Sequence, residues 1–150
     1  LLTNYGPVAN IWFDGWSTPK SGPWEEELAI PELYETIHRL QPGCLISYKF
    51  GITGGEDFYA PEYGWPEHMP EEMVHVVASG KPIEVCHHIA GWGLVKEYDG
   101  KHRGADSIME NLEYAAGHSA NLLLNTGPLG DGSIDTQDIA TLREVGKRLG

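Results

Sequence analysis

The sequence predicts a parallel α/β fold, a (β/α)8 TIM barrel of which this chain holds only the C-terminal half, about four β/α units. Strand-like and helix-like segments alternate, and the strand-like segments are apolar. Polar, aromatic and acidic residues gather directly after these strands, which favours a barrel over a doubly wound sheet, because barrel active sites are built from strand-to-helix loops. These clusters are residues 14–16, 49–62, 87–96 and 125–131.

The first half of the chain contains two expected strands and one expected helix. Residues 8–13 are an almost continuous apolar run, typical of a strand covered on both faces. A loop rich in Gly, Pro and Ser follows, and residues 25–40 are expected to be helical up to the stop at Pro42-Gly43. Residues 44–48 form the second strand. The apolar residues at helical spacing are Leu28, Leu33, Ile37 and Leu40.

The second half begins with residues 49–82, a long stretch rich in Gly, Pro and acid that we expect to be a functional loop. Asp106 or Ser107 is expected to cap the helix that follows the third strand. The remaining expected elements are strands at residues 83–88 and 120–125 and helices at residues 106–117 and 136–149. The inward positions of the first of these helices are Ile108, Met109, Leu112 and Ala116.

Composition excludes several kinds of partner. The net charge of −12 argues against nucleic acid, since phosphate binding needs clustered Lys and Arg. No apolar run approaches the roughly 20 residues of a membrane span, and no signal peptide is recognised. Cys44 and Cys86 lie in separate apolar segments and are expected to be free, buried thiols.

The chain reads as part of a longer protein. It begins with Leu1 in a segment that resembles the end of a helix already under way. We therefore expect residues 1–150 to be the C-terminal part of a barrel whose N-terminal strands are absent. Such a half barrel exposes strand edges, so the isolated chain is expected to self-associate and to be inactive.

Four carboxylates are candidates for chemistry: Asp14, Glu56, Glu62 and Glu84. Asp14 ends a strand between two tryptophans, where burial of an unpaired charge would cost several kcal/mol. A carboxylate placed rigidly at a strand end suits the nucleophile of a retaining glycosidase, and the indole of Trp12 suits the apolar face of a sugar. The alternative is that Asp14 caps a turn and Trp12 fills the core.

The partner carboxyl group is expected in the loop after the second strand. Glu62 follows a proline and precedes an aromatic residue that can desolvate it, which suits a general acid. Glu56 is the alternative acid/base, although it also fits a solvated loop acid. Glu84 lies inside a strand, where a structural ion pair or hydrogen bond is the stronger interpretation.

No metal or nucleotide site is expected. His87 and His88 are adjacent in a strand and point to opposite faces, so they cannot readily chelate one ion. One of them is expected to face the barrel mouth and touch substrate. The sequence contains neither the glycine-rich dinucleotide motif nor the P-loop motif, and no cofactor is expected.

Four segments in order resemble motifs of the α-L-fucosidases of glycoside hydrolase family 29. Residues 11–15 (Ile-Trp-Phe-Asp-Gly) are similar to the family's nucleophile motif. Residues 83–86 and 91–93 resemble its Trp-Glu-Thr-Cys and Trp-Gly-Tyr segments. Residues 120–132, which run from Asn-Leu-Leu-Leu-Asn through Gly-Pro to Asp-Gly, resemble a signature late in its barrel.

The resemblance implies a retaining exo-α-L-fucosidase that hydrolyses terminal α-L-fucosyl residues of oligosaccharides or glycoconjugates through a covalent glycosyl-enzyme. By position Asp14 matches the nucleophile and Glu62 the acid/base. Lys49 falls where some members carry a sugar-binding arginine, Trp92 where an aromatic residue packs on the fucose methyl, and Trp12 at a pocket position. His87 is the histidine expected to reach the substrate.

Departures from the family pattern leave two alternatives. Lys49 lacks the bidentate geometry of arginine, Leu94 replaces a tyrosine, and Ile83 replaces a tryptophan. The alternatives are an inactive carbohydrate-binding relative of the same fold and an α-glycosidase of different sugar preference. The resemblance implies a periplasmic, secreted or lysosomal-type compartment for the whole protein.

Overall fold

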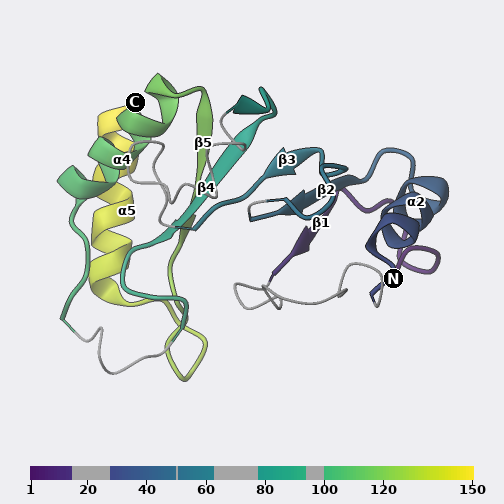
Figure 1. Cartoon of the computed structure of the whole chain (residues 1–150). Coiled ribbons are helices and arrows are strands. Elements are labelled where there is room, and N and C mark those ends of the chain that lie inside the picture. The colour runs from purple at the N-terminus through teal and green to yellow at the C-terminus, as the bar shows by residue number, and fades with distance from the viewer. Residues whose placement is uncertain (15–27, 50, 63–77, 94–99) are drawn as a thin grey trace. The chain divides into compact units, whose positions relative to one another are not determined.

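Figure 1 shows the computed structural model of the chain, which describes residues 1–14, 28–49, 51–62, 78–93 and 100–150. The chain divides into two compact units, Leu1–Ile83 and Glu84–Gly150. Each unit has a hydrophobic core of its own. The expected loop at 15–24 and the first three residues of the expected helix at 25–40 lie outside the described residues.

The first unit is built on parallel strands, as the alternating pattern predicts. Strand β1 (Asn10–Phe13) pairs with β2 (Leu45–Tyr48), and β2 pairs with β3 (Phe58–Tyr59), both in parallel. Tyr59 in turn pairs in parallel with Ile83, the first residue of β4 (Ile83–His88). The parallel sheet fits part of an α/β barrel.

The structure corrects the expectation that residues 49–82 form one loop, because β3 lies within that stretch. Strands β2 and β3 are joined by residues 49–57, and the described part of this connection contains no helix. Parallel strands usually need a crossover of a dozen or more residues, most often a helix. The regular alternation of one strand and one helix is therefore not kept between β2 and β3.

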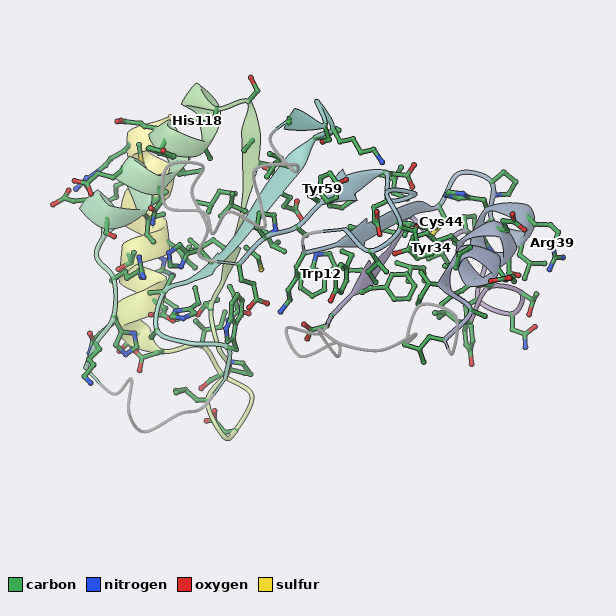
Figure 2. All side chains as sticks on the ribbon, in the orientation of Figure 1. Trp12, Tyr34, Arg39, Cys44, Tyr59 and His118 are labelled. Atoms are coloured by element: carbon green, nitrogen blue, oxygen red, sulfur yellow. The ribbon has the colours of Figure 1, made fainter. Side chains whose placement is uncertain are left out.

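Helix α2 (Ile30–Leu40) packs against β1 and β2. Its buried residues are Ile30, Tyr34 and Ile37, which share one face because they are four and three residues apart. Tyr34 packs on Phe13 of β1 with ring centroids 5.6 Å apart, and Figure 2 labels it on the helix. Of the four apolar residues noted at helical spacing, Ile37 is buried, whereas Leu28, Leu33 and Leu40 are exposed.

The two faces of β1 and β2 differ in character. Ile11, Phe13 and Ile46 pack into the core beneath α2, whereas the opposite face carries Asn10, whose side chain donates to Ser47 Oγ at 3.4 Å. Every residue of β1 is only half-buried. The expectation of a strand covered on both faces is therefore wrong for β1, and its second face is polar enough to line a site.

The second unit contains the elements predicted for it. Strand β4 is a hydrogen-bonded neighbour of β5 (Ala120–Asn125), and helices α4 (Ala105–Gly117) and α5 (Thr136–Leu149) follow β4 and β5 in the chain (Figure 1). Cys44 in the first unit and Cys86 in the second are buried thiols that form no disulfide, as expected. The core of the second unit consists of Ile89, Ile108 and Val145, with partly buried neighbours that include Met109 and Leu112.

Two details of α4 differ from expectation. Gly104 is the N-cap and no side chain caps the helix, so neither Asp106 nor Ser107 has that role. Ala115 is buried while Ala116 is exposed. None of the described helices is long and apolar enough to cross a membrane.

Gly51 and Gly54 offer a test of how tightly the β2–β3 connection is packed. Both have φ of +77°, but a Cβ on Gly51 would lie 2.5 Å from Cε1 of Tyr59, whereas a Cβ on Gly54 would meet nothing within 4 Å. Gly54→Ala should therefore lower the free energy of unfolding by only about 1 kcal/mol, from backbone strain. Gly51→Ala should lower it by roughly 2–4 kcal/mol, because steric overlap adds to the same strain. Urea unfolding of both variants measures the difference, and equal losses would contradict the packing described.

Candidate active site

The parallel register brings the first two candidate residues together. Phe13 pairs with Tyr48, so the residues that follow them, Asp14 and Lys49, leave neighbouring strands at the same edge of the sheet. Tyr48 also pairs with Tyr59, which places Glu62 three residues beyond the end of the paired part of β3. The carboxyl ends of parallel strands thus gather these three side chains, as barrel active sites require.

Lys49 forms an ion pair with each of the two candidate carboxylates, Asp14 and Glu62. Its Nζ lies 2.8 Å from Asp14 Oδ1 and 2.7 Å from Glu62 Oε1. Because both contacts meet at one nitrogen, the two carboxylate oxygens are at most 5.5 Å apart. The side chain of Lys49 is 3% exposed, that of Glu62 is 12% exposed and that of Asp14 is 73% exposed. Asp14 is therefore neither buried nor unpaired, which corrects the reason for which the sequence singled it out.

The electrostatics of Lys49 follow from its two partners. Burial, the largest influence, lowers the pKa of Lys49, but hydrogen bonds and charge attraction from Asp14 and Glu62 outweigh it and raise that pKa above the ordinary value. Lys49 therefore stays a cation at neutral pH.

Trp12 completes the described part of this site in the first unit. Nζ of Lys49 lies over the Trp12 ring, 5.9 Å from its centroid, a distance at which the ring attracts a cation. The indole Nε1 is buried and has no hydrogen-bond partner among the described residues. Trp12, labelled in Figure 2, is half-buried. Its ring lies beside Lys49, and its role in a sugar-binding pocket stays a prediction.

Glu56, the alternative acid/base, is buried in the connection between β2 and β3. It is 1% exposed, so the interpretation as a solvated loop acid is wrong. Its Oε1 accepts hydrogen bonds from the Tyr34 hydroxyl at 2.9 Å and from the backbone N–H groups of Ile52 and Thr53 at 2.7 and 3.3 Å. Burial, and then the charge of Glu56, raise the pKa of Tyr34, so Tyr34 remains a donor.

In the second unit, both adjacent histidines of β4 are buried. Their rings stand nearly perpendicular, at 89°, with centroids 5.7 Å apart. Nδ1 of His87 accepts the backbone N–H of His88 at 2.9 Å, and Nδ1 of His88 accepts the backbone N–H of Gly91 at 2.8 Å. Burial, followed by the charges of Arg103 and His88, lowers the pKa of His87 to about 4. His87 is therefore a neutral ring, and its contact with substrate stays a prediction.

Trp92 lies on the loop after β4 and is 42% exposed. Its ring meets the His88 ring edge-on, with centroids 5.2 Å apart. The side chain of Asn125, at the end of β5, donates to the carbonyl of Gly91 at 2.8 Å. The ring of Trp92 is therefore partly exposed at the carboxyl end of β4, where an aromatic face is suited to stacking on a sugar.

Gly127 connects two of the family-like segments, residues 91–93 and 120–132. A Cβ on Gly127 would lie 2.9 Å from Cα of Gly93, so the loop after β5 passes directly against the loop that carries Trp92. Only a glycine allows this approach without displacing backbone. Leu94, which follows in the chain, lies outside the described residues, as does Tyr63.

Sequence reasoning missed one buried carboxylate in the second unit. Asp138, in the first turn of α5, accepts the Thr126 hydroxyl at 2.6 Å and contacts Nδ1 of His102 at 2.6 Å. It ties the loop after β5 to the residues that precede α4. The pattern offered no signal, because Asp in the first turn of a helix is normally a solvated residue. Glu84, as expected, has a structural hydrogen bond, accepting from Asn121 at 2.6 Å.

Among the described residues no three His, Cys, Asp or Glu side chains are grouped so as to hold a metal ion. The comparisons with known proteins identify the family of the chain. The family model described as α-L-fucosidase matches residues 1–150.

The chain belongs to the α-L-fucosidase family.

Solved structures of fucosidases share its fold. α-L-Fucosidase isoenzyme 1 from Paenibacillus thiaminolyticus is 30% identical with a TM-score of 0.78, over 99% of this chain and 36% of that one. α-L-Fucosidase AlfC from Lactobacillus casei, in complex with its α-L-fucose product, is 23% identical with a TM-score of 0.71, over 98% and 41%. A family 29 α-L-fucosidase from Bacteroides thetaiotaomicron is 20% identical with a TM-score of 0.73, over 95% and 34%.

The chain therefore spans between about a third and two-fifths of the length of these fucosidases. No curated protein sequence gives a significant match. The resemblance drawn from the four motifs is confirmed at the level of the family. The catalytic roles of Asp14 and Glu62 and the substrate contacts of Trp12, Lys49, His87 and Trp92 stay predictions.

The low pKa of His87 predicts that the free energy of unfolding depends on pH. The unfolded chain binds a proton at this histidine below its ordinary pKa of 6.5, whereas the folded chain does so only near 4. The free energy of unfolding should therefore fall as the pH is lowered from about 6.5 to about 4, by roughly 2–3 kcal/mol at about 1.4 kcal/mol per pKa unit. Urea unfolding across this range should show a shallower fall for His87→Gln. The exposed His118, labelled in Figure 2, provides the control, and a fall equally steep in His87→Gln and His118→Gln would contradict the prediction.

Proposed function

We propose that this chain carries the catalytic carboxylates of a retaining exo-acting α-L-fucosidase, an enzyme that removes terminal α-L-fucosyl residues from fucosylated glycans. The observation that carries the proposal is the shared cation: Lys49 bonds both Asp14 and Glu62. Family membership supports the substrate class, and AlfC, one of the structural neighbours, is described with its α-L-fucose product bound.

The separation of the two carboxylates favours retention of configuration. Retaining glycosidases place their carboxyl groups about 5–5.5 Å apart, and inverting enzymes place them about 6.5–9.5 Å apart to admit a water molecule. The Asp14 and Glu62 oxygens that share Lys49 are at most 5.5 Å apart. This distance supports direct attack by a carboxylate on the sugar.

In the proposed first step, an oxygen of Asp14 forms a bond to the anomeric carbon while the glycosidic bond breaks. Glu62 gives its proton to the departing oxygen. In the second step, Glu62 takes a proton from water, whose oxygen bonds to the anomeric carbon and displaces Asp14. The ammonium of Lys49 stabilises the Asp14 carboxylate as it is released, because it lies 2.8 Å from that group.

Trp12, Lys49, Trp92 and His87 are the proposed substrate contacts. The exposed ring of Trp92 is suited to the fucose methyl group, and Trp12 offers a buried N–H to a sugar oxygen. Because the chain spans only part of its relatives, we expect the isolated 150-residue chain to be inactive. Activity should be measured on the longer protein that contains it.

Replacement of Asp14 tests the nucleophile. In that longer protein, Asp14→Gly should slow hydrolysis of an aryl α-L-fucoside by roughly 10³-fold or more, because no carboxylate remains to form the glycosyl-enzyme. Added azide should restore part of the rate and yield a fucosyl azide of inverted configuration. Wild-type turnover in Asp14→Gly would rule out this assignment, and activity on a different aryl α-glycoside alone would favour another sugar preference.

Replacement of Glu62 tests the acid/base. Glu62→Ala should slow fucosides with poor leaving groups by roughly 10²–10⁴-fold, while activated aryl fucosides lose much less because their leaving groups need no proton. The slope of log kcat/KM against leaving-group pKa measures this difference. Glu84→Ala is the matched control, since Glu84 is a strand carboxylate whose hydrogen bond to Asn121 is structural. An unchanged slope in Glu62→Ala would remove Glu62 from the acid role.

A further inference from the structure

The carboxyl group of Glu56 is almost completely removed from solvent. It is 1% exposed, and a carboxylate taken from water costs several kcal/mol unless hydrogen bonds replace its hydration. Here three donors converge on one oxygen: the Tyr34 hydroxyl and the N–H groups of Ile52 and Thr53. The other oxygen, Oε2, has no hydrogen-bond partner among the described residues. Glu56 therefore faces the chain's own backbone.

The three hydrogen-bond donors to Glu56 show which segments this side chain joins. Ile52 and Thr53 belong to the turn that begins directly after β2, three and four residues beyond Lys49. Tyr34 comes from α2, so one carboxylate fastens this turn to the helix beneath the sheet. The same turn is fastened a second time by Lys81, whose ammonium donates to the carbonyl oxygens of Gly54 and Glu56.

Two further contacts fix the connection between β2 and β3. Gly51 packs so closely on Tyr59 of β3 that a single added carbon would overlap the ring. At its far end, Asp57 accepts the backbone N–H of Ile46 at 2.7 Å. The connection from β2 to β3 is thus fixed at both ends and in the middle, although no helix is present among its described residues.

This connection carries Lys49 at its start and leads to Glu62 just beyond its end. We propose that Glu56 is a positioning residue for the catalytic site: by accepting the backbone of the turn, it sets Lys49 at the distance from which its ammonium bonds both Asp14 and Glu62. The inference rests on the proposed function for its catalytic consequence. The positioning itself is a structural claim that can be measured without any activity.

The positioning role differs from the acid/base role in one chemical respect. An acid/base must carry a proton, so replacement by glutamine removes it completely. A positioning acceptor needs only an oxygen, which a glutamine side chain keeps at Oε1, while its amide nitrogen would take the place of the unpartnered Oε2 of Glu56. Glu56→Gln should therefore behave almost like the wild type, and Glu56→Ala should not.

The first test measures how well Lys49 is held. An amine-reactive acylating reagent should modify Lys49 slowly, because this lysine is 3% exposed and bonded to two carboxylates. In Glu56→Ala the rate at Lys49 should rise about tenfold relative to the exposed Lys147, as local opening becomes easier. Peptide mass spectrometry follows both lysines in one sample. Tyr34→Phe, which removes a single donor, should show a smaller rise, and Glu56→Gln almost none.

The second test links positioning to catalysis through a double-mutant cycle. If Glu56 acts through Lys49, Glu56→Ala should lower kcat/KM by about tenfold in the wild type but by less than about twofold in a Lys49→Met background. The leaving-group slope should stay unchanged in Glu56→Ala, and azide should not accelerate it. Glu35→Ala is the matched control, because Glu35 is an exposed carboxylate adjacent to Tyr34 on the same helix.

Equal labelling of Lys49 in the wild type, Glu56→Ala and Tyr34→Phe would overturn the proposal, as would additive losses in the cycle. Loss of activity in Glu56→Gln as severe as in Glu56→Ala, with a steepened leaving-group slope, would return Glu56 to the acid/base role. If the protein does not hydrolyse fucosides at all, the labelling experiment still decides the positioning claim. Failure of the positioning proposal can therefore be distinguished from failure of the proposed function.

Discussion

The structure of the candidate site depends on a buried ammonium group and the two anions that neutralise it. A charge removed from water is tolerated only where opposite charges and hydrogen bonds replace its hydration. Lys49 has both, from Asp14 and from Glu62. The same pairing brings two carboxylates that would otherwise repel each other to within 5.5 Å. The cation therefore accounts at once for its own burial and for the closeness of the proposed nucleophile and acid/base.

The parallel sheet supplies half of this arrangement, and an irregular connection supplies the other half. Register alone places Asp14 beside Lys49, because both follow paired residues of neighbouring strands. Glu62 is reached through residues 49–57, where hydrogen bonds of Glu56 and Lys81 replace the packing of a crossover helix. In the second unit Asp138 similarly joins two loops through Thr126 and His102. Buried carboxylates that bond loop residues are thus a recurring device in this chain.

Much of this fold could be predicted from the sequence. The strand Ile83–His88, the strand Ala120–Asn125 and the helix Thr136–Leu149 have the predicted bounds, because apolar runs and turn residues mark them clearly. Strand β3 was missed since two residues carry no periodic pattern. The helical spacing of the apolar residues does not identify the buried face of α2, because Tyr34 also packs inward, on Phe13.

The sequence indicates which residues belong to the candidate site, but not the hydrogen bonds and ion pairs that those residues form. Asp14 and Glu62 are singled out by position in motifs, and family membership is confirmed, yet Lys49 was expected to bind sugar and not to join the two acids. Glu56 resembles a solvated acid in the sequence because its three donors come from a distant helix and from backbone groups, neither of which leaves a sequence signal. Such contacts become visible only once the chain is folded.

The proposed mechanism requires that Asp14, held by Lys49, forms a covalent bond to the sugar. The most direct measurement is incubation of the longer protein with 2-deoxy-2-fluoro-L-fucosyl fluoride, whose ring fluorine slows hydrolysis of a glycosyl-enzyme while the fluoride leaving group still allows it to form. Peptide mapping by mass spectrometry then locates the label. We expect one fluorofucosyl group per protein molecule, attached to the Asp14 carboxylate. Attachment to Glu62 or Glu56, or turnover of fucosides that gives the inverted product without any label, would contradict this mechanism.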